Sequence, residues 1–405
     1  MEDIIAFDAG HEDLLHDLAY DFYGLRLMTC SSDQRLRLWA FDEAAGTWVP
    51  RDAWKAHDAP VLRVVWAHPE FGSIVASCSM DRTVRIWQEF EAVPRLPGYD
   101  HAALPATDAA AAAGPYGPSP WIERARLADA RAPVHAIAFA PPHLGFQLAS
   151  AAADGLVRIY HASHPAWTLM EEIEVVPVAL RSQEARICLD WCPARHVPAM
   201  MFKTSGHDWN PMIYRISAQN RWKGYEVLAG HTDLVTDVAW APNLGRTYHL
   251  IATACRDGHV RIYKLTPKPP PGHLFGGDEG PPHRGHRFVV TLVADLSDHA
   301  AEVWQVRWNV TGTILASAGD DGTVRNWKAA SGGSGGWRCL SIINAEVASA
   351  QAAPSTGTGG AAPGLSGLPA GIEQSPRDAY GHEPTGPPAM TPFGAHGGGY
   401  GYGYH

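Results

Sequence analysis

The sequence has no long apolar run, no basic cluster and few cysteines. Its 405 residues nowhere place 18 apolar side chains in succession, so we expect no transmembrane segment. Lys and Arg number 32 against 42 Asp and Glu, and no short stretch gathers the five or six basic side chains that bind a phosphate backbone. We therefore expect no direct nucleic-acid partner.

Cysteine usage and the first residues bear on the compartment. Cysteines scattered thinly along a chain of this length are typical of a reducing environment, so we expect free thiols. The opening MEDIIAFDAGHED carries acidic residues where a secretory signal would carry basic ones, which predicts a cytosolic or nuclear protein. The six cysteines are Cys30, Cys78, Cys188, Cys192, Cys255 and Cys339.

Glycine, proline and tryptophan are abundant instead. With 40 Gly, 32 Pro, 15 Trp and 46% apolar residues, the composition predicts a globular protein in which many turns join short strands. Because a large aromatic side chain recurs so often, the composition favours internal repeats.

One phrase returns five times: a small residue, an Asp, and then an apolar-basic-apolar-aromatic run. The copies are CSSDQRLRLW (30–39), CSMDRTVRIW (78–87), AAADGLVRIY (151–160), ACRDGHVRIY (254–263) and AGDDGTVRNW (318–327). The long interval between Asp154 and Asp257 holds one degenerate copy, FKTSGHDWNPMIYRI. The chain therefore contains six repeat units.

Each unit has the pattern of four strands. Alternating apolar segments such as VLRVVWAHP precede each phrase, a second strand leads into the Asp, a third follows it, and a fourth begins near a Trp. Four strands in units of roughly 40–45 residues are typical of β-propeller blades. We predict an all-β, six-bladed propeller. A β-sandwich is the alternative, but it gives no reason for the repeated Asp.

The repeated Asp predicts a hydrogen-bonded tetrad in each blade, because a buried carboxylate needs donors. A chain of carboxylate, imidazole, hydroxyl and indole N–H would satisfy every member and hold the blade together. A hydrolytic triad uses the same residue types, but copies spread round a ring indicate a scaffold. The sets are His11, Thr29, Asp33 and Trp39; His57, Ser77, Asp81 and Trp87; Ser150, Asp154 and Tyr160, without a His; His231, Thr253, Asp257 and Tyr263; and His299, Ser317, Asp321 and Trp327.

Counting strands leaves one strand over. Asp3–Phe7 is apolar-rich, and Trp337–Ile343 already supplies a fourth strand to the sixth unit. The surplus strand, with Ile4, Ile5 and Phe7, would border an open seam that a partner completes by adding strands. In the alternative, residues 337–343 form a loop and the ring closes on itself.

The propeller is predicted to span residues 1–345, with insertions at about 91–120 and 267–286. Residues 346–405 are rich in Gly, Pro and Ala and end GGGYGYGYH, so we expect a disordered tail.

Motifs that resemble catalytic or metal sites have structural explanations. Ser334 in GGSGG joins two strands and is not in a nucleophile elbow. His11 and His16 are five residues apart, not four as in a helical zinc motif. Cys188 and Cys192 share one strand and are expected to pack in the core. We predict no catalytic residues, no metal and no cofactor.

Residues from about 8 to 343 resemble the Seh nucleoporin family, which consists of WD-repeat propellers related to the Sec-thirteen coat subunit. The resemblance rests on stretches such as HEDLLHDLAYDFYGLRLMTCSSDQ, WAHPEFGSIVASCSMDRTVRIW and APNLGRTYHLIATACRDGHVRIYKL. The longer insertions, the Gly-rich tail and the degenerate fourth unit depart from the family pattern.

The resemblance implies a non-enzymatic scaffold. Its six-bladed open propeller would be completed in trans by a blade from an α-solenoid nucleoporin, within the Y-complex of the nuclear pore at the nuclear envelope. It also implies a role in the SEA/GATOR complex, which supports TOR signalling at the vacuolar or lysosomal membrane. Two alternatives stay open: a COPII-type vesicle-coat propeller, and a peptide-reading WD-repeat adaptor.

Overall fold

The computed structural model describes residues 7–90, 120–163, 166–176, 187–194, 199–202, 210–217, 219, 221–268, 287–330 and 336–344. Ile4, Ile5, Ser334, most of both insertions and the tail lie outside these ranges. The described residues form β-strands and two single-turn 3₁₀ helices, η1 (Pro69–Phe71) and η3 (Pro142–Leu144). No helix in these ranges has the length and apolarity needed to cross a bilayer.

The strands form six antiparallel sheets of four consecutive strands each, called blades 1 to 6 below. Blade 1 comprises β1 (Leu15–Tyr20), β2 (Arg26–Ser31), β3 (Arg35–Asp42) and β4 (Thr47–Lys55). Blade 2 comprises β5 (Val61–Trp66), β6 (Ile74–Ser79), β7 (Val84–Glu89) and β8 (Trp121–Leu127). Blade 3 comprises β9 (Val134–Phe139), β10 (Gln147–Ala152), β11 (Leu156–Ser163) and β12 (Ala166–Glu174).

The second half of the chain repeats the arrangement. Blade 4 comprises β13 (Leu189–Trp191), β14 (Ala199–Phe202), β15 (Met212–Ile216) and β16 (Trp222–Val227). Blade 5 comprises β17 (Val235–Trp240), β18 (His249–Cys255), β19 (Val260–Lys268) and β20 (Arg287–Leu296). Blade 6 comprises β21 (Val303–Trp308), β22 (Ile314–Gly319), β23 (Thr323–Ala329) and β24 (Trp337–Asn344).

The repeated Asp shapes the turn between the second and third strands of a blade. In blade 2, Asp81 Oδ1 accepts the Thr83 backbone N–H at 2.9 Å, which forms a local Asx turn. The residue after the Asp takes the left-handed backbone conformation, which glycine adopts without strain. It is Gly155, Gly258 or Gly322 in three blades and Gln34 or Arg82 in two others.

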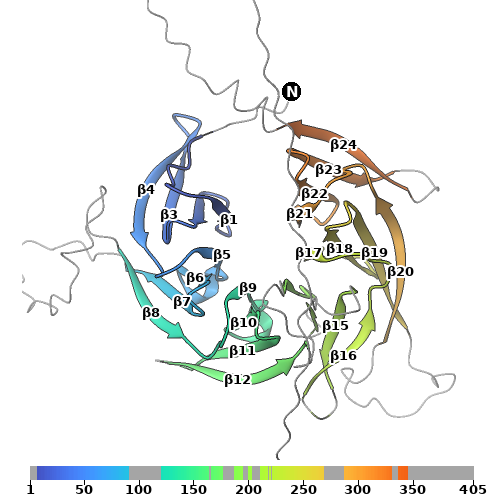
Figure 1. The fold of residues 1–405 in the computed structure, drawn as a ribbon, viewed down its shortest axis with the longest axis horizontal. Helices are drawn as coiled ribbons and strands as arrows, with labels where there is room; N and C mark the ends of the chain where they lie inside the picture. The colour runs from blue at the N-terminus through green and yellow to red at the C-terminus, as the bar shows by residue number, and fades with distance from the viewer. Residues whose placement is uncertain are drawn as a thin grey trace, which may run out of the picture. The chain divides into compact units, whose positions relative to one another are not determined.

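The blades follow one another in chain order around a ring (Figure 1). The innermost strands β1, β5, β9, β13, β17 and β21 contact each other in that order. Within the described ranges, β21 and β1 make no contact of similar extent.

Five apolar clusters join neighbouring blades. In each cluster, one face of a blade packs against the opposite face of the preceding blade. In the blades that have a tetrad, the packing face is the one that carries its Ser or Thr. In the cluster between blades 5 and 6, for example, Leu315 and Trp327 pack against Ala252 and Ile262. Among the described residues, no such cluster joins blade 6 to blade 1.

The predicted fourth strands near Trp48, Trp121, Trp167, Trp222 and Trp337 are confirmed. Residues 337–344 are a strand that pairs with β23, so the alternative in which they form a loop is wrong. Blade 6 thus takes its fourth strand from its own part of the chain.

Candidate functional site

The boundary between blades 6 and 1, called the seam below, has a partly exposed and mostly apolar face on blade 6. The face that points away from blade 5 carries Ile314, Ala316, Ala318, Val324 and Asn326, and we call it the seam face of blade 6. Val324 is 37% exposed, whereas its repeat equivalent Val260, on the face of blade 5 that packs against blade 6, is 0% exposed.

A polar side chain marks the same face. Asn326 occupies the position that holds an isoleucine in three other repeats, and its amide donates to Ser341 Oγ at 3.0 Å. The corresponding side chains are buried between blades: Ile86, Ile159 and Ile262. An asparagine there is compatible with a surface that none of the six described blades covers.

The opposite side of the seam is the face of blade 1 that carries Leu18, Tyr20, Leu27, Thr29 and Trp39, called the seam face of blade 1. Leu18 is 47% exposed, whereas its equivalent in blade 2, Val64, is 1% exposed. Among the described residues, no neighbouring blade buries the inner part of this face as blade 1 buries Val64.

A hydrogen bond that links blades elsewhere has no counterpart at the seam in the described chain. At three boundaries, an indole at the end of an innermost strand donates to a carbonyl of the preceding blade. These bonds are Trp66 to Ala19 at 2.9 Å, Trp191 to Ala138 at 3.1 Å and Trp308 to Ala239 at 3.1 Å. Blade 1 carries Tyr20 at this position, and its ring packs on Trp48 in the same blade.

Phe7 covers part of the seam face of blade 1. Its ring centroid lies 5.0 Å from that of Trp39 and 6.4 Å from that of Trp48. Trp39 is buried although no blade of the described residues packs on it, and Phe7 from the segment before β1 covers it instead. The predicted seam residues Ile4 and Ile5 lie outside the described residues.

Three of the sets proposed as tetrads come together as hydrogen-bonded chains. In blade 2, His57 Nδ1 lies 2.8 Å from Asp81 Oδ2, His57 Nε2 lies 2.8 Å from Ser77 Oγ, and the Trp87 indole donates to Ser77 at 3.0 Å. The same chains join His11, Thr29, Asp33 and Trp39 in blade 1 and His299, Ser317, Asp321 and Trp327 in blade 6.

Burial sets the protonation states in these chains. It lowers the pKa of His57, and hydrogen bonding to Asp81 only partly opposes the shift. Burial would raise the pKa of Asp81, but hydrogen bonds from His57 and Thr83 hold it well below its ordinary value. A neutral imidazole therefore donates to the ionised carboxylate and accepts from the Ser77 hydroxyl.

The other two sets differ from the expectation. In blade 5, His231 Nε2 meets Thr253 at 2.9 Å, but its Nδ1 lies 3.1 Å from the Leu228 carbonyl. Asp257 accepts from Thr232 at 2.9 Å, and the Tyr263 hydroxyl donates to the Ala229 carbonyl at 2.9 Å. The phenol reaches past Thr253 because its oxygen lies further from the backbone than an indole N–H does.

In blade 3, which has no His before its first strand, Arg158 takes over the carboxylate. Its guanidinium lies 2.7 Å from Asp154 Oδ2. Burial raises the pKa of the Tyr160 hydroxyl, and the nearby carboxylate of Asp129, which was not among the predicted tetrad residues, adds to the shift. Asp129 precedes β9 by about the same number of residues as His57 precedes β5. This spacing could have identified Asp129 as the residue in the histidine position of blade 3.

The residues discounted as catalytic or metal ligands occupy structural positions. His16 bonds Ser32 Oγ at 2.6 Å, and Cys188 and Cys192 are buried in the cluster between blades 4 and 5. All six cysteines are free thiols. In the ranges that the structure describes, no three His, Cys, Asp or Glu side chains are grouped to hold a metal ion.

The chain matches the family model "WD domain, G-beta repeat" at residues 4–40, 48–88, 222–264 and 290–328. It is 37% identical to Nucleoporin seh1 of Schizosaccharomyces pombe, over 85% of this chain and 98% of the relative. It is 35% identical to Nucleoporin SEH1 of Saccharomyces cerevisiae, over 84% and 99% respectively. It is 38% identical to Nucleoporin SEH1 of Homo sapiens, over 83% and 86%. The chain is an all-β WD40 propeller and belongs to the Seh nucleoporin family.

Proposed function

We propose that this chain is a non-enzymatic scaffold nucleoporin of the Y-complex that binds an α-solenoid nucleoporin at the seam. The observation that carries the proposal is the pair of seam faces, where Leu18 and Val324 are exposed although their repeat equivalents are buried between blades. Strands donated by the partner would pair with a blade edge and cover both faces. The names of the relatives support a role at the nuclear pore.

The proposed interaction has an energetic basis. Fully burying an exposed Leu or Val side chain contributes roughly 1.5–3 kcal/mol, and Leu18 and Val324, which are 47% and 37% exposed, would contribute about half of that each. Because association itself costs several kcal/mol, the donated strands must bury further apolar surface on both faces. Backbone hydrogen bonds between the donated strands and the blade edge would fix the orientation of the partner. The same seam would serve a related blade-donating partner in the SEA/GATOR complex at the vacuolar or lysosomal membrane.

The two alternatives have less support. A COPII-type coat subunit would use a similar seam, but the similar curated proteins are named nucleoporins. A peptide-reading adaptor needs unpaired groups at the central opening, whereas Asp237 there is paired with both Arg63 and Arg307.

Co-purification with candidate α-solenoid nucleoporins tests the proposal. Val324→Asp places a charge on the seam face of blade 6 and is expected to abolish a one-to-one complex on size-exclusion chromatography while leaving the melting temperature nearly unchanged. Val310→Asp is the matched control, because Val310 is 86% exposed in the turn between β21 and β22 and lies away from the seam face. Equal binding by both variants would contradict the proposal.

A further inference from the structure

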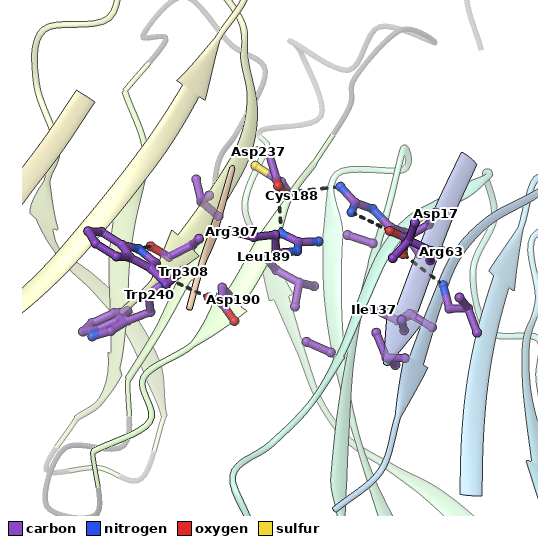
Figure 2. Close-up of a pocket in the computed structure, with 18 of the residues that line it drawn as sticks. Asp17, Arg63, Ile137, Cys188, Leu189, Asp190, Asp237, Trp240, Arg307 and Trp308 are labelled. Carbon is purple, nitrogen blue, oxygen red and sulfur yellow. Dashed lines mark hydrogen bonds and ion pairs between the residues drawn. The ribbon is translucent and has the colours of Figure 1, made fainter. Parts of the chain in front are cut away.

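The innermost strands line a central channel that holds a cavity of about 550 Å³. Acidic and basic side chains from five blades line it (Figure 2). Asp190 on β13 of blade 4 accepts the Trp240 backbone N–H at 2.6 Å. The other four are called the channel network: Asp17 on β1 of blade 1, Arg63 on β5 of blade 2, Asp237 on β17 of blade 5 and Arg307 on β21 of blade 6.

Arg63 connects the two halves of the ring. Its Nη1 lies 3.5 Å from Asp17 Oδ1, and its Nη2 lies 3.4 Å from Asp237 Oδ1. Blades 2 and 5 are not neighbours along the ring, so this guanidinium spans the channel. The two carboxylates raise the pKa of Arg63 although its burial opposes this, and both carboxylates are buried.

The network continues to the blades on both sides of the seam. Asp237 Oδ2 lies 2.8 Å from Arg307 Nη1 and accepts the Val306 backbone N–H at 3.2 Å, so it holds blade 6. Asp17 Oδ2 accepts the Val64 backbone N–H at 3.3 Å, so it joins blade 1 to blade 2.

Gln305 adds a second link from blade 6. With its amide oxygen turned toward the guanidinium groups, it accepts from Arg63 at 3.2 Å and from Arg307 at 3.1 Å. In the other amide orientation, Gln305 Nε2 donates directly to Asp17 Oδ1 of blade 1 at 3.4 Å. Blades 1 and 6 are therefore linked by polar contacts of Arg63 and Gln305 in the channel, although no apolar cluster of the described residues joins them.

We infer that Arg63 is a positioning residue for partner binding: it braces the ring across the channel and fixes the separation of the two seam faces before strands are inserted. An open ring held only by clusters between successive blades can flex, and small rotations at each boundary add up at the seam. The bridge from Arg63 in blade 2 to blades 5 and 6 reduces the number of blade boundaries over which such rotations add up. The effect of the Arg63 bridge on partner binding rests on the proposed function. Its effect on the distance between the seam faces can be measured in the free chain alone.

The effect on affinity follows from population shift. If loss of the bridge reduces the fraction of chains with a correctly spaced seam to about one tenth, the apparent affinity for the partner falls about tenfold. The five clusters between blades remain intact in such a variant. Its blades are therefore expected to fold.

The experiment measures the seam separation in the free, full-length chain. Spin labels are placed on cysteines introduced at Ala45, in the exposed turn after β3, and at Ala329, at the exposed end of β23, with Cys339 changed to Ser. Arg63→Gln is expected to broaden the distance distribution measured by pulsed electron resonance. The matched control is Arg85→Gln, since Arg85 is a buried arginine of blade 2 that pairs within that blade, with Asp58 at 2.8 Å, and is expected to leave the distribution narrow.

Two further results decide the inference. A folded Arg63→Gln chain with the narrow distribution of the unaltered protein would overturn it. If that variant does not fold, Arg63→Lys keeps the charge but cannot bridge two carboxylates, so it should broaden the distribution, and a narrow one would again overturn the inference. Partner co-purification of the unaltered chain tests the proposed function separately, so failure of one does not imply failure of the other.

Discussion

The boundary between blades 5 and 6 and the seam between blades 6 and 1 use equivalent positions of the same repeat phrase with opposite results. On blade 5 these positions hold Val260 and Ile262, which are buried against blade 6. On blade 6 they hold Val324 and Asn326, of which the first is exposed and the second is hydrogen-bonded within its own blade. The shared residues of the phrase therefore determine the fold of a blade. The residues at these two positions differ according to whether another blade packs on that face.

The first blade shows the complementary difference. Val64 of blade 2 lies beneath blade 1, whereas Leu18 at the same position of blade 1 is exposed. Trp66 donates across a blade boundary, whereas its counterpart Tyr20 packs within its own blade. Both faces of the seam thus depart from the repeat at positions that elsewhere contact a neighbouring blade.

Exchanging the residues at the distinguishing position gives the largest expected effect. Ile262→Asn buries an amide without a partner and removes apolar packing, which should reduce the free energy of unfolding by about 3 kcal/mol. Asn326→Ile at the seam should change it by less than about 1 kcal/mol. Chemical denaturation of both variants measures the difference, and equal losses would show that the two boundaries are packed alike.

The tetrad hydroxyls give a smaller contrast. Ser77→Ala leaves the His57 ring nitrogen and the Trp87 indole without their shared partner between two packed blades, at a cost of about 2 kcal/mol. Thr29→Ala removes the same kind of partner in blade 1, where Thr29 is also buried but Trp39 is covered by the segment that carries Phe7 and not by a packed blade. Opening of that segment would admit water, so the expected cost is about 1 kcal/mol. Thermal melting compares them. A larger loss of melting temperature for Thr29→Ala than for Ser77→Ala would show that water does not reach the Thr29 position.

Acid should weaken the tetrads through their histidines first. Burial lowers the pKa of both His11 and His57, so the unfolded chain binds more protons than the folded chain once the pH falls toward the ordinary histidine value of about 6.5. The free energy of unfolding then decreases with falling pH, by at most about 1.4 kcal/mol per unit for each group. Urea midpoints at pH 7.5 and 5.5 measure this, and a flat profile would contradict neutral, buried imidazoles.

Asp321 extends this dependence to lower pH. Burial opposes the shift, but hydrogen bonds from Thr323 and His299 lower its pKa to about 2, so its stabilising contribution is lost between about pH 4 and 2. Asp321→Asn is the control, because it should flatten the profile only in that lower range.

Removing a polar atom at the innermost strands gives the smallest effect. Trp66→Phe loses the indole bond to the Ala19 carbonyl and part of the ring that packs on Trp121 and Arg26, and should cost about 1–2 kcal/mol. Tyr20→Phe removes an exposed hydroxyl at the equivalent position and should cost close to nothing in the free chain. Denaturant midpoints for the pair test this, and a loss of similar size for Tyr20→Phe would indicate a bond across the seam.

Sequence patterns predicted the strands well because alternation and turn residues act locally. The Asp-centred phrase fixed the turn between the second and third strands, and the offsets of His57 and Ser77 identified a tetrad. The fifth blade departed from its expected set because Thr232 and the longer Tyr263 offered other partners, which residue spacing does not reveal.

Counting strands predicted the seam and Phe7 beside it, but it did not identify Leu18, Val324 or Asn326 on the two seam faces. Asn326 was visible as the one polar residue at a position that other repeats fill with Ile or Leu, and this signal was available. The pairing of Arg63 with Asp237 was not, because these residues are far apart in the chain and meet only when the ring brings opposite blades together.

The most direct test of the seam is hydrogen exchange on the full-length chain, alone and in a size-exclusion-purified one-to-one complex with an α-solenoid nucleoporin. We predict that the backbone amides of β1 and β22–β24 exchange faster in the free chain than those of blade 5. We also predict that they gain the largest protection when the partner binds. Protection that falls on other blades, with β1 already protected in the free chain, would contradict it.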